Sequence, residues 1–408
     1  MNDDAPAERT EYYNSTSDQS AFSLGVLREL VAQPTAPFHE ERVAARIGRW
    51  LRAWGIPFAV DVYGNIVAHY QRGAPCRPLV LMAHMDHPAF TIGAAGGPDG
   101  AHVTAALEGG VPARAFAREV PVRIYPRVGD ARERGIAGRI VGYLLGAGPR
   151  DVDLHITVDD VASVGDIAPG DFGVWDLPLF EVRDSLIHAR VLDDLAGCAA
   201  ILLTLHAAAN EGWHTDVYGV FTRAEEVGLV GARAALDSGA LPREGAVVSL
   251  EASKALPGAQ QGDGPVIRVG DRATTFGEGA EIVLKAAAER LGSNIWHPSR
   301  QATVAVQRQL MSGGQCEGSA AARLGYQTTG LAFPLGNYHN VSADATLVPE
   351  TIHVRDYITG VALLREAARL MPDLPAIETQ ESGQDGRYAS HLERLAASAH
   401  SIKAASSR

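Results

Sequence analysis

The sequence predicts an α/β fold: a mixed, mostly parallel sheet with helices on both faces and a small β-barrel inserted into it. On both sides of a middle segment, residues 90–182, short apolar runs of strand length alternate with segments of helical periodicity, which is typical of βα units. The middle segment is rich in Gly, Val and Pro and has almost no helical periodicity. This pattern indicates a small barrel or sandwich.

The helices are predicted from apolar residues that recur every three or four positions. The helix Glu40–Trp54 is the most clearly bounded, since Pro37 precedes it and Gly55 closes it. The predicted helices are Leu24–Val31, Glu40–Trp54, Leu195–Ala209, Gly231–Leu236 and Val354–Leu370. The predicted strands are Pro78–Met82, Asp216–Phe221 and Ala246–Leu250, with Val120–Tyr125, Gly138–Leu144 and Leu154–Val158 in the middle segment.

These patterns divide the chain into an α/β domain with an insertion and a tail at each end. Both ends are rich in Ser, Ala, Gln, Asp and Glu, which favours mobile tails, although His391–Ser401 fits a short helix. The inserted strands have little sequence of their own to bury them, so we expect a partner surface and a homo-oligomer. The predicted boundaries are 1–20 for the N-terminal tail, 21–89 and 183–371 for the α/β domain, 90–182 for the barrel and 372–408 for the C-terminal tail.

Composition and charge exclude several classes of protein. With 36 basic and 48 acidic residues the formal net charge is −12, which disfavours nucleic acid and anionic membranes as partners. No run approaches the roughly 20 apolar residues of a membrane span, and the acidic N-terminus lacks the apolar core of a secretory signal. The three cysteines form no CxxC pair, so neither a disulfide framework nor a structural zinc knuckle is expected. We therefore predict a cytoplasmic enzyme.

His84 and Asp86 stand at the end of a predicted strand, where an H-x-D pattern follows the run Leu79–Ala83. A metal-bound imidazole needs its second ring nitrogen held in place, often by a carboxylate, and this pattern supplies both groups from one strand end. Alone, the pattern also fits a surface histidine. His87 is an alternative ligand, but the position at the strand end favours His84.

Two acidic pairs follow later in the chain. Asp193 and Asp194 precede a predicted helix, where Asp194 fits an N-cap and the two oxygens of Asp193 suit a bridge between two cations. Glu225 and Glu226 follow a predicted strand, and a charged helix start is the simplest explanation of this pair taken alone. Beside a metal, one glutamate would bind the ion while its neighbour takes a proton from an activated water.

Glu251 and His339 complete the set of candidate metal ligands. Glu251 follows an apolar strand, and ligands gather at the carboxyl ends of strands in open α/β sheets. His339 lies on a predicted loop. Two imidazoles and a surplus of carboxylates suit two divalent ions, most naturally zinc, with cobalt or manganese as alternatives. Two metals and a spare carboxylate predict hydrolysis of an amide by an activated water.

No other catalytic sequence motif competes with this prediction. The chain lacks GxSxG, HExxH, a P-loop and a complete GxGxxG, which excludes serine hydrolases, zincins and nucleotide-binding proteins. Cys316 is a further candidate nucleophile near the substrate pocket, whereas Cys198 has apolar helix neighbours and is expected in the core.

In order and spacing, these residues resemble the di-zinc aminopeptidases of peptidase family 42, the tetrahedral and glutamyl aminopeptidases, over about residues 24–370. The similarity includes Asp61-Val-Tyr-Gly-Asn, Val164-Gly-Asp and Gly264-Pro-Val-Ile-Arg. The long gap between Asp86 and Asp193 matches the β domain that this family inserts there. Families related to it, the acylases and carboxypeptidases of family 20, insert their extra domain after the glutamate pair.

The resemblance implies a phosphorylase/hydrolase-like zinc peptidase fold, a cis peptide bond between Asp193 and Asp194, and a homo-oligomer between a dimer and a dodecameric tetrahedral shell. It also implies a metalloprotease that removes N-terminal residues from small peptides. The implied roles are one metal held by His84, Asp193 and Glu251, a second held by Asp193, Glu226 and His339, Glu225 as the general base, and Asp86 as the residue that orients His84.

Three differences from the family pattern keep other functions open. Glu251 replaces the usual Asp, Asp194 replaces an Asn, and Gly313-Gly-Gln-Cys-Glu-Gly replaces Gly-Gly-Thr-Asp-Ala-Gly. Because a glutamate at position 251 is more familiar in family 20, a di-zinc deacylase or carboxypeptidase is the alternative. A glycosidase with Glu225 and a second carboxylate would need no metal. A non-catalytic binding protein is a further alternative, but such a protein would not need a general base such as Glu225.

Overall fold

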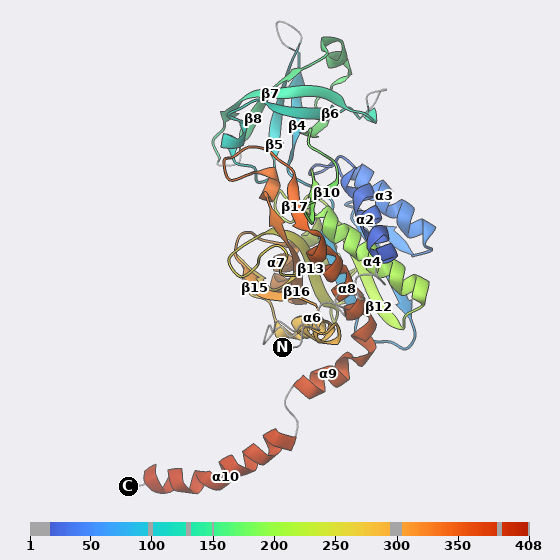
Figure 1. Ribbon diagram of the computed structural model, residues 1–408. Helices are drawn as coiled ribbons and strands as arrows, with labels where there is room; N and C mark the ends of the chain where they lie inside the picture. The colour runs from blue at the N-terminus through green and yellow to red at the C-terminus, as the bar shows by residue number, and fades with distance from the viewer. Residues whose placement is uncertain are drawn as a thin grey trace, which may run out of the picture.

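The computed structural model describes residues 17–96, 101–127, 132–148, 151–293, 304–381 and 386–406. A mixed sheet of 11 strands, covered by helices, forms the larger part of the molecule, and a closed barrel forms the smaller part (Figure 1). The helices are α2 (Ser17–Val31), α3 (Glu41–Ala53), α4 (Leu195–Glu211), α5 (Val230–Asp237), α6 (Glu278–Arg290), α7 (Glu317–Arg323), α8 (Val354–Leu370), α9 (Leu374–Glu381) and α10 (Gly386–Ser406).

The strands of the large sheet follow the order β1-β2-β12-β3-β13-β16-β17-β11-β10, and β14 and β15 lie beside β16. Their bounds are β1 (Phe58–Val60), β2 (Ile66–Arg72), β3 (Leu79–His84), β10 (Glu181–Arg183), β11 (Leu186–Ala189), β12 (Thr215–Thr222), β13 (Ala246–Lys254), β14 (Val266–Asp271), β15 (Gln307–Met311), β16 (Gln327–Gly336) and β17 (Glu350–His353).

The parallel strands β12, β3, β13 and β16 form the centre of the sheet, and their apolar side chains are buried on both faces. Helices α2, α3, α4, α6 and α8 contribute to the core on one face, and α5 and α7 contribute to the core on the other. Continuous apolar runs on these strands are therefore explained by burial on two sides. The predicted fold class, a mixed and mostly parallel sheet with an inserted barrel, is confirmed.

The barrel closes in the order β4-β5-β8-β7-β6-β9. Its interior holds a core of its own, in which Phe90 and Phe116 both contact Trp175. The expectation that these strands need a partner surface to bury them is therefore wrong, because closure lets alternate side chains fill the interior. Its strands are β4 (Ala89–Ala95), β5 (His102–Glu108), β6 (Val120–Tyr125), β7 (Ile136–Leu145), β8 (Val152–Val158) and β9 (Phe172–Trp175).

The described parts of the two predicted tails are largely helical, and the predicted short helix His391–Ser401 lies within α10. Helix α2 begins at Ser17 and packs on α4, while the rest of the predicted N-terminal tail, residues 1–16, lies outside the described residues. Helices α9 and α10 occupy most of residues 372–408, and α10 extends away from the body (Figure 1). Alanine and leucine, which are strong helix formers, explain why this polar segment is helical. The large sheet resumes at β10, which begins at Glu181, slightly before the predicted end of the barrel segment at residue 182.

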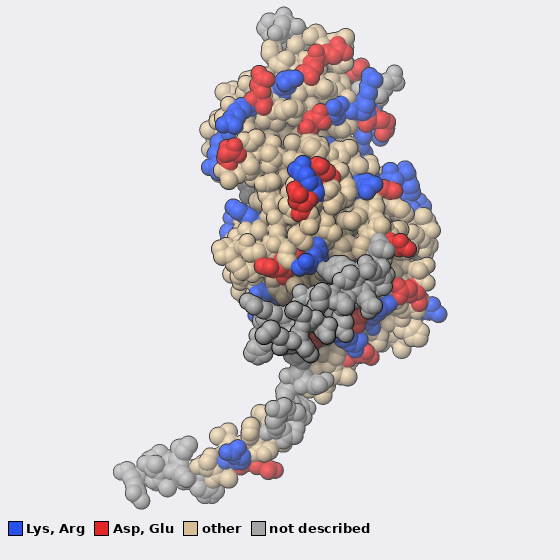
Figure 2. All heavy atoms as spheres, viewed as in Figure 1, with Lys and Arg blue, Asp and Glu red and all other residues tan. Residues whose placement is uncertain are grey.

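The distribution of charged side chains on the surface agrees with the mixture of acidic and basic residues in the sequence. Acidic and basic side chains are interspersed over the described part of the face shown in Figure 2, without a continuous basic patch for nucleic acid. None of the described helices has the length and apolar character needed to cross a membrane.

Candidate metal centre

The predicted ligands meet at the carboxyl edge of the parallel strands. His84 is the last residue of β3 and lies in register with the end of β12, whose following loop carries Glu225 and Glu226. The register between β3 and β13 brings Glu251 level with His84, although β13 itself continues to Lys254. The ends of neighbouring parallel strands thus bring three separate segments together.

The other two ligands reach the same edge from segments outside these strands. Asp193 follows β11 and stands just before α4. His339 lies in the short 3₁₀ turn η4 (Tyr338–Asn340) after β16. All seven predicted site residues are buried in the structure, with at most 9% of the surface of any one exposed.

Two sets of three side chains share Asp193. In the first, Nε2 of His84 lies 3.4 Å from Oδ1 of Asp193 and 3.7 Å from Oε1 of Glu251. In the second, Nε2 of His339 lies 3.7 Å from Oδ2 of Asp193 and 3.4 Å from Oε1 of Glu226. Within each set the candidate ligand atoms lie within 4.8 Å of one another. The two oxygens of Asp193 face different histidines, as a carboxylate between two cations would.

The buried atoms of these sets fit metal ions. Polar atoms in a protein interior nearly always have a hydrogen-bond partner. Among the described residues, four atoms of the candidate ligands are buried without one: His84 Nε2, Asp193 Oδ1, Glu226 Oε1 and Glu251 Oε2. A divalent cation in each set would satisfy these atoms, and imidazole nitrogen with carboxylate oxygen is a donor set that suits zinc.

The electrostatics of the cluster also favour bound metal ions. Burial, reinforced by Glu251, raises the pKa of Asp193 well above its ordinary value. Burial and the neighbouring Glu225 do the same to the pKa of Glu226. Burial alone would lower the pKa of His84, but the carboxylates of Asp193 and Asp86 close to its ring raise it well above normal. Crowded buried carboxylates are costly as anions unless positive charge is added, which a cation supplies.

Asp86 positions two parts of the cluster. Nδ1 of His84 donates to the Asp86 backbone carbonyl at 3.1 Å and lies 3.7 Å from the Asp86 carboxylate. The carboxylate itself accepts the backbone N–H groups of Glu225, at 2.9 Å, and Glu226, at 3.1 Å. Asp86 therefore holds the His84 imidazole through its backbone carbonyl and the glutamate pair through its side chain. The sequence did not indicate the contact with the glutamate pair.

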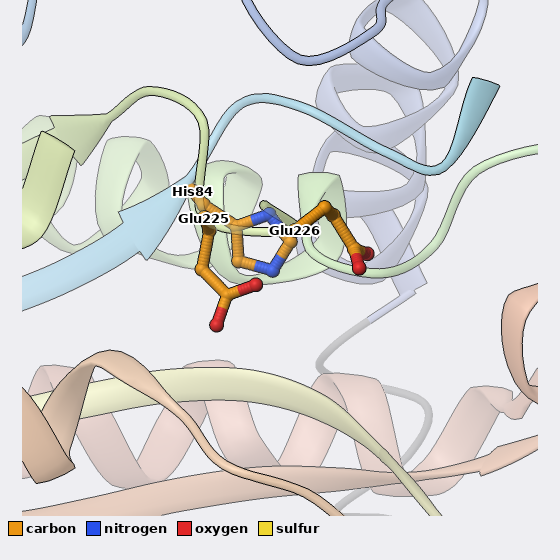
Figure 3. A group of neighbouring side chains, drawn as sticks. All are labelled: His84, Glu225 and Glu226. Atoms are coloured by element: carbon orange, nitrogen blue, oxygen red, sulfur yellow. The ribbon is translucent and has the colours of Figure 1, made fainter. Parts of the chain in front are cut away.

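Glu225 and Glu226 project from one loop towards the same histidine. In Figure 3 their carboxylate groups point to different sides of the His84 ring. An oxygen of each lies within 4.8 Å of a ring nitrogen of His84. Glu226 also belongs to the set that includes His339, so Glu225 is the glutamate left without a place in the two sets that share Asp193.

His87, the alternative ligand, is engaged at both ring nitrogens. Nδ1 is hydrogen-bonded to the backbone carbonyl of Asp193 at 2.8 Å, and Nε2 is hydrogen-bonded to Oδ1 of Asn340 at 2.9 Å. The Nδ1 atom of His339 instead contacts the backbone carbonyl of Gly110, in the barrel domain, at 3.0 Å. That contact leaves Nε2 of His339 facing Asp193 and Glu226, and it gives the barrel a part in the site.

Sequence reasoning missed Gly110 and Glu350. Glu350 is a buried carboxylate that accepts the backbone N–H groups of Leu192 and of two candidate ligands, Asp193 and His339. Its only sequence signal is an acidic residue at the start of a short strand. Gly110 carries no signal, because its contact is made by a backbone carbonyl.

The remaining candidates have structural roles. The Asp194 side chain accepts the N–H of Gly197 as the N-cap of α4, and the predicted cis peptide bond between Asp193 and Asp194 is present. Cys198 is fully buried in the core, as expected. Burial raises the pKa of the Cys316 thiol to about 12, which argues against a nucleophilic thiolate at neutral pH.

The fold and this buried cluster together define a metal-dependent hydrolase. A family model of the M42 glutamyl aminopeptidases matches residues 151–362, more than half of the chain. The chain belongs to this family and is a metal-dependent aminopeptidase; the deacylase or carboxypeptidase alternative is not favoured.

Solved structures of aminopeptidases share this fold. The TET1 peptidase of Pyrococcus horikoshii has a TM-score of 0.68 and 22% identity, over 85% of this chain and 99% of that one. Aminopeptidase APDkam598 of the archaeon Desulfurococcus kamchatkensis has a TM-score of 0.69 and 20% identity, over 88% and 98%. An M18-family aminopeptidase of Thermotoga maritima has a TM-score of 0.63 and 14% identity, over 88% and 98%. At these identities the likeness concerns the fold.

Proposed function

We propose that this chain binds two divalent ions, zinc in the first place and cobalt or manganese as substitutes, and removes N-terminal residues from short peptides. The observation that carries the proposal is the pair of ligand sets that share Asp193. The proposed assignment is His84, Asp193 and Glu251 for one ion, Asp193, Glu226 and His339 for the other, Glu225 as general base and Asp86 as the residue that positions His84 and the glutamate pair.

The mechanism follows from the placement of Glu225. Bound divalent cations would polarise the scissile carbonyl and lower the pKa of the attacking water. Burial raises the pKa of Glu225 well above its usual range, which favours uptake of a proton by its carboxylate. Glu225 accepts the proton of the attacking water and returns it to the leaving amine. Asp86 fixes the Glu225 backbone during both transfers.

The substrate class is proposed from a cleft beside Glu251. Arg268 and Lys254 line this cleft together with Ser253 and Tyr338. Nη1 of Arg268 donates to Oγ of Ser253 at 2.9 Å, while its buried Nε has no hydrogen-bond partner among the described residues. Two cationic side chains next to a candidate metal ligand favour a peptide whose N-terminal residue is acidic.

Assembly and location are further parts of the proposal. Structural neighbours include a protein described as a dodecamer and one described as forming a tetrahedron or a large octahedral shell. This supports a homo-oligomer, which light scattering would test: a mass near that of twelve 43.2 kDa chains indicates a shell, and a monomer contradicts the proposal. Three free cysteines support a reducing, cytoplasmic location.

The decisive experiment is metal removal followed by reactivation. Chelation should abolish hydrolysis of glutamyl-p-nitroanilide, and two equivalents of zinc or cobalt should restore it. The glutamyl substrate should be preferred over the leucyl one, and N-acyl amino acids should not be cleaved. Glu225→Gln should lose about 10²- to 10⁴-fold in kcat and keep its metal, because the amide cannot accept a proton. Activity that survives chelation, or loss of metal from this variant, would contradict the assignment.

A further inference from the structure

Glu350 connects two ligand-bearing segments that lie far apart in the sequence. Its side chain is fully buried at the start of β17. Oε2 accepts the backbone N–H groups of Leu192, at 2.8 Å, and Asp193, at 3.1 Å, and Oε1 accepts the N–H of His339 at 3.0 Å. One carboxylate thus holds the backbone at Asp193 and the backbone at His339 together.

His87 makes a second connection between the same segments. Its ring is hydrogen-bonded to the carbonyl of Asp193 and to the side-chain oxygen of Asn340, the residue after His339. The Asn340 amide nitrogen donates to the Arg190 carbonyl at 2.8 Å, which keeps the Asn340 oxygen turned to His87. Through its two ring nitrogens, His87 therefore links the backbone at Asp193 to the residue that follows His339.

The turn that carries His339 needs such contacts. Asn337, His339 and Asn340 have φ angles of 53°, 55° and 63°, in the left-handed region. Residues other than glycine rarely adopt this conformation and keep it where surrounding contacts hold it. The bond from the His339 N–H to Glu350 and the bond from His87 to Asn340 are contacts of this kind.

We propose that Glu350 and His87 form a brace that holds the Asp193 and His339 segments at the separation required by the ion of the second ligand set. Glu350 is a positioning residue in this scheme and does not touch the ion. The inference rests on the proposed di-metal function, since it concerns the ion assigned to Asp193, Glu226 and His339. Loss of the brace lets the left-handed turn relax, so affinity for this ion falls. The ion assigned to the first set, His84, Asp193 and Glu251, is retained.

The test is a cobalt titration of metal-free Glu350→Gln, followed by visible absorption and by competition with a chelator. The amide keeps the size of the side chain but places an NH₂ group against a backbone N–H. We expect the first equivalent of Co²⁺ to bind as in the wild type and the second to bind about 10- to 100-fold more weakly. His339→Ala provides the reference spectrum for a protein that lacks the second ion. His87→Gln, titrated in the same way, should show the same selective loss and serves if Glu350→Gln fails to fold.

Asp356→Asn is the matched control. Asp356 is also a buried carboxylate that accepts two backbone N–H groups, those of Gly262 at 2.7 Å and Gly264 at 2.9 Å, but neither of these carries a proposed ligand. This variant should lose stability against urea to a similar extent and keep both cobalt affinities. The inference is overturned if Glu350→Gln binds both ions like the wild type, or if the control loses the second ion equally. A wild-type chain that binds fewer than two ions would contradict the proposed function itself.

Discussion

Glu317 gives a stability prediction that is independent of catalysis. It is fully buried at the start of α7, where Oε1 accepts a hydrogen bond from Thr222 and Oε2 has no hydrogen-bond partner among the described residues. Burial raises the pKa of this carboxyl group from 4.5 to about 8. The folded state therefore holds a proton that the unfolded state releases above pH 4.5, so this group makes the fold less stable as pH rises towards 8.

Glu317→Gln removes the titration and keeps a neutral side chain of the same size. One unit of pKa corresponds to about 1.4 kcal/mol. In metal-free protein the variant should exceed the wild type in free energy of unfolding by about 1 kcal/mol at pH 5 and by about 4 to 5 kcal/mol at pH 8.5. The trend comes from the ionisation of Glu317 in the unfolded wild-type chain.

Urea unfolding, followed by circular dichroism at both pH values, measures this difference. Glu278→Gln is the control, because the Glu278 side chain is 83% exposed and a surface change should alter stability by no more than about 0.5 kcal/mol. A Glu317→Gln variant that is less stable than the wild type at both pH values, or whose advantage does not grow with pH, would refute the reasoning.

Three further predictions concern the metal centre. Gly110→Ala would bring a Cβ to 3.1 Å from the His339 ring and should weaken metal retention in chelator competition, whereas Gly142→Ala, which meets nothing within 4 Å, should not; equal retention would refute this. Asp86→Asn should lower kcat about 10- to 100-fold at unchanged metal content, because an amide cannot accept both N–H groups of the glutamate pair; unchanged kcat would count against it. Asp193→Ala should retain less than one metal ion per chain by elemental analysis, and two retained ions would exclude a shared ligand.

The convergence of the strand-end candidates could be predicted because local sequence positions them. His84 ends an apolar strand, and Glu251 lies near the end of another, so a parallel sheet brings them to one edge whatever the remaining chain does. Glu225 and Glu226 follow from the same rule. Asp193 and His339 were candidates from their residue types alone, since neither stands at the end of a predicted strand, and only the resemblance to a known family assigned them to particular ions.

The contacts that complete the cluster could not be predicted. Glu350 bonds to the backbone at Asp193, and Gly110 bonds to His339 across the two domains. Both contacts involve backbone groups, which every residue has, so no residue type marks them. The short strands β10, β11 and β17 were also missed, because they have only three or four residues, which is too few for a periodic pattern to stand out in the sequence.

The sequence by itself therefore determined the α/β class, the inserted barrel and the residue types of the cluster, because apolar periodicity and strand ends are local properties of the chain. Only the tertiary structure decided which atoms face each other. It directed the carboxylate of Asp86 to the glutamate backbone, engaged both nitrogens of His87, and brought Glu350 and Gly110 to His339. These arrangements depend on packing between segments distant in sequence, where the burial of unpaired polar groups is costly and each must find a partner.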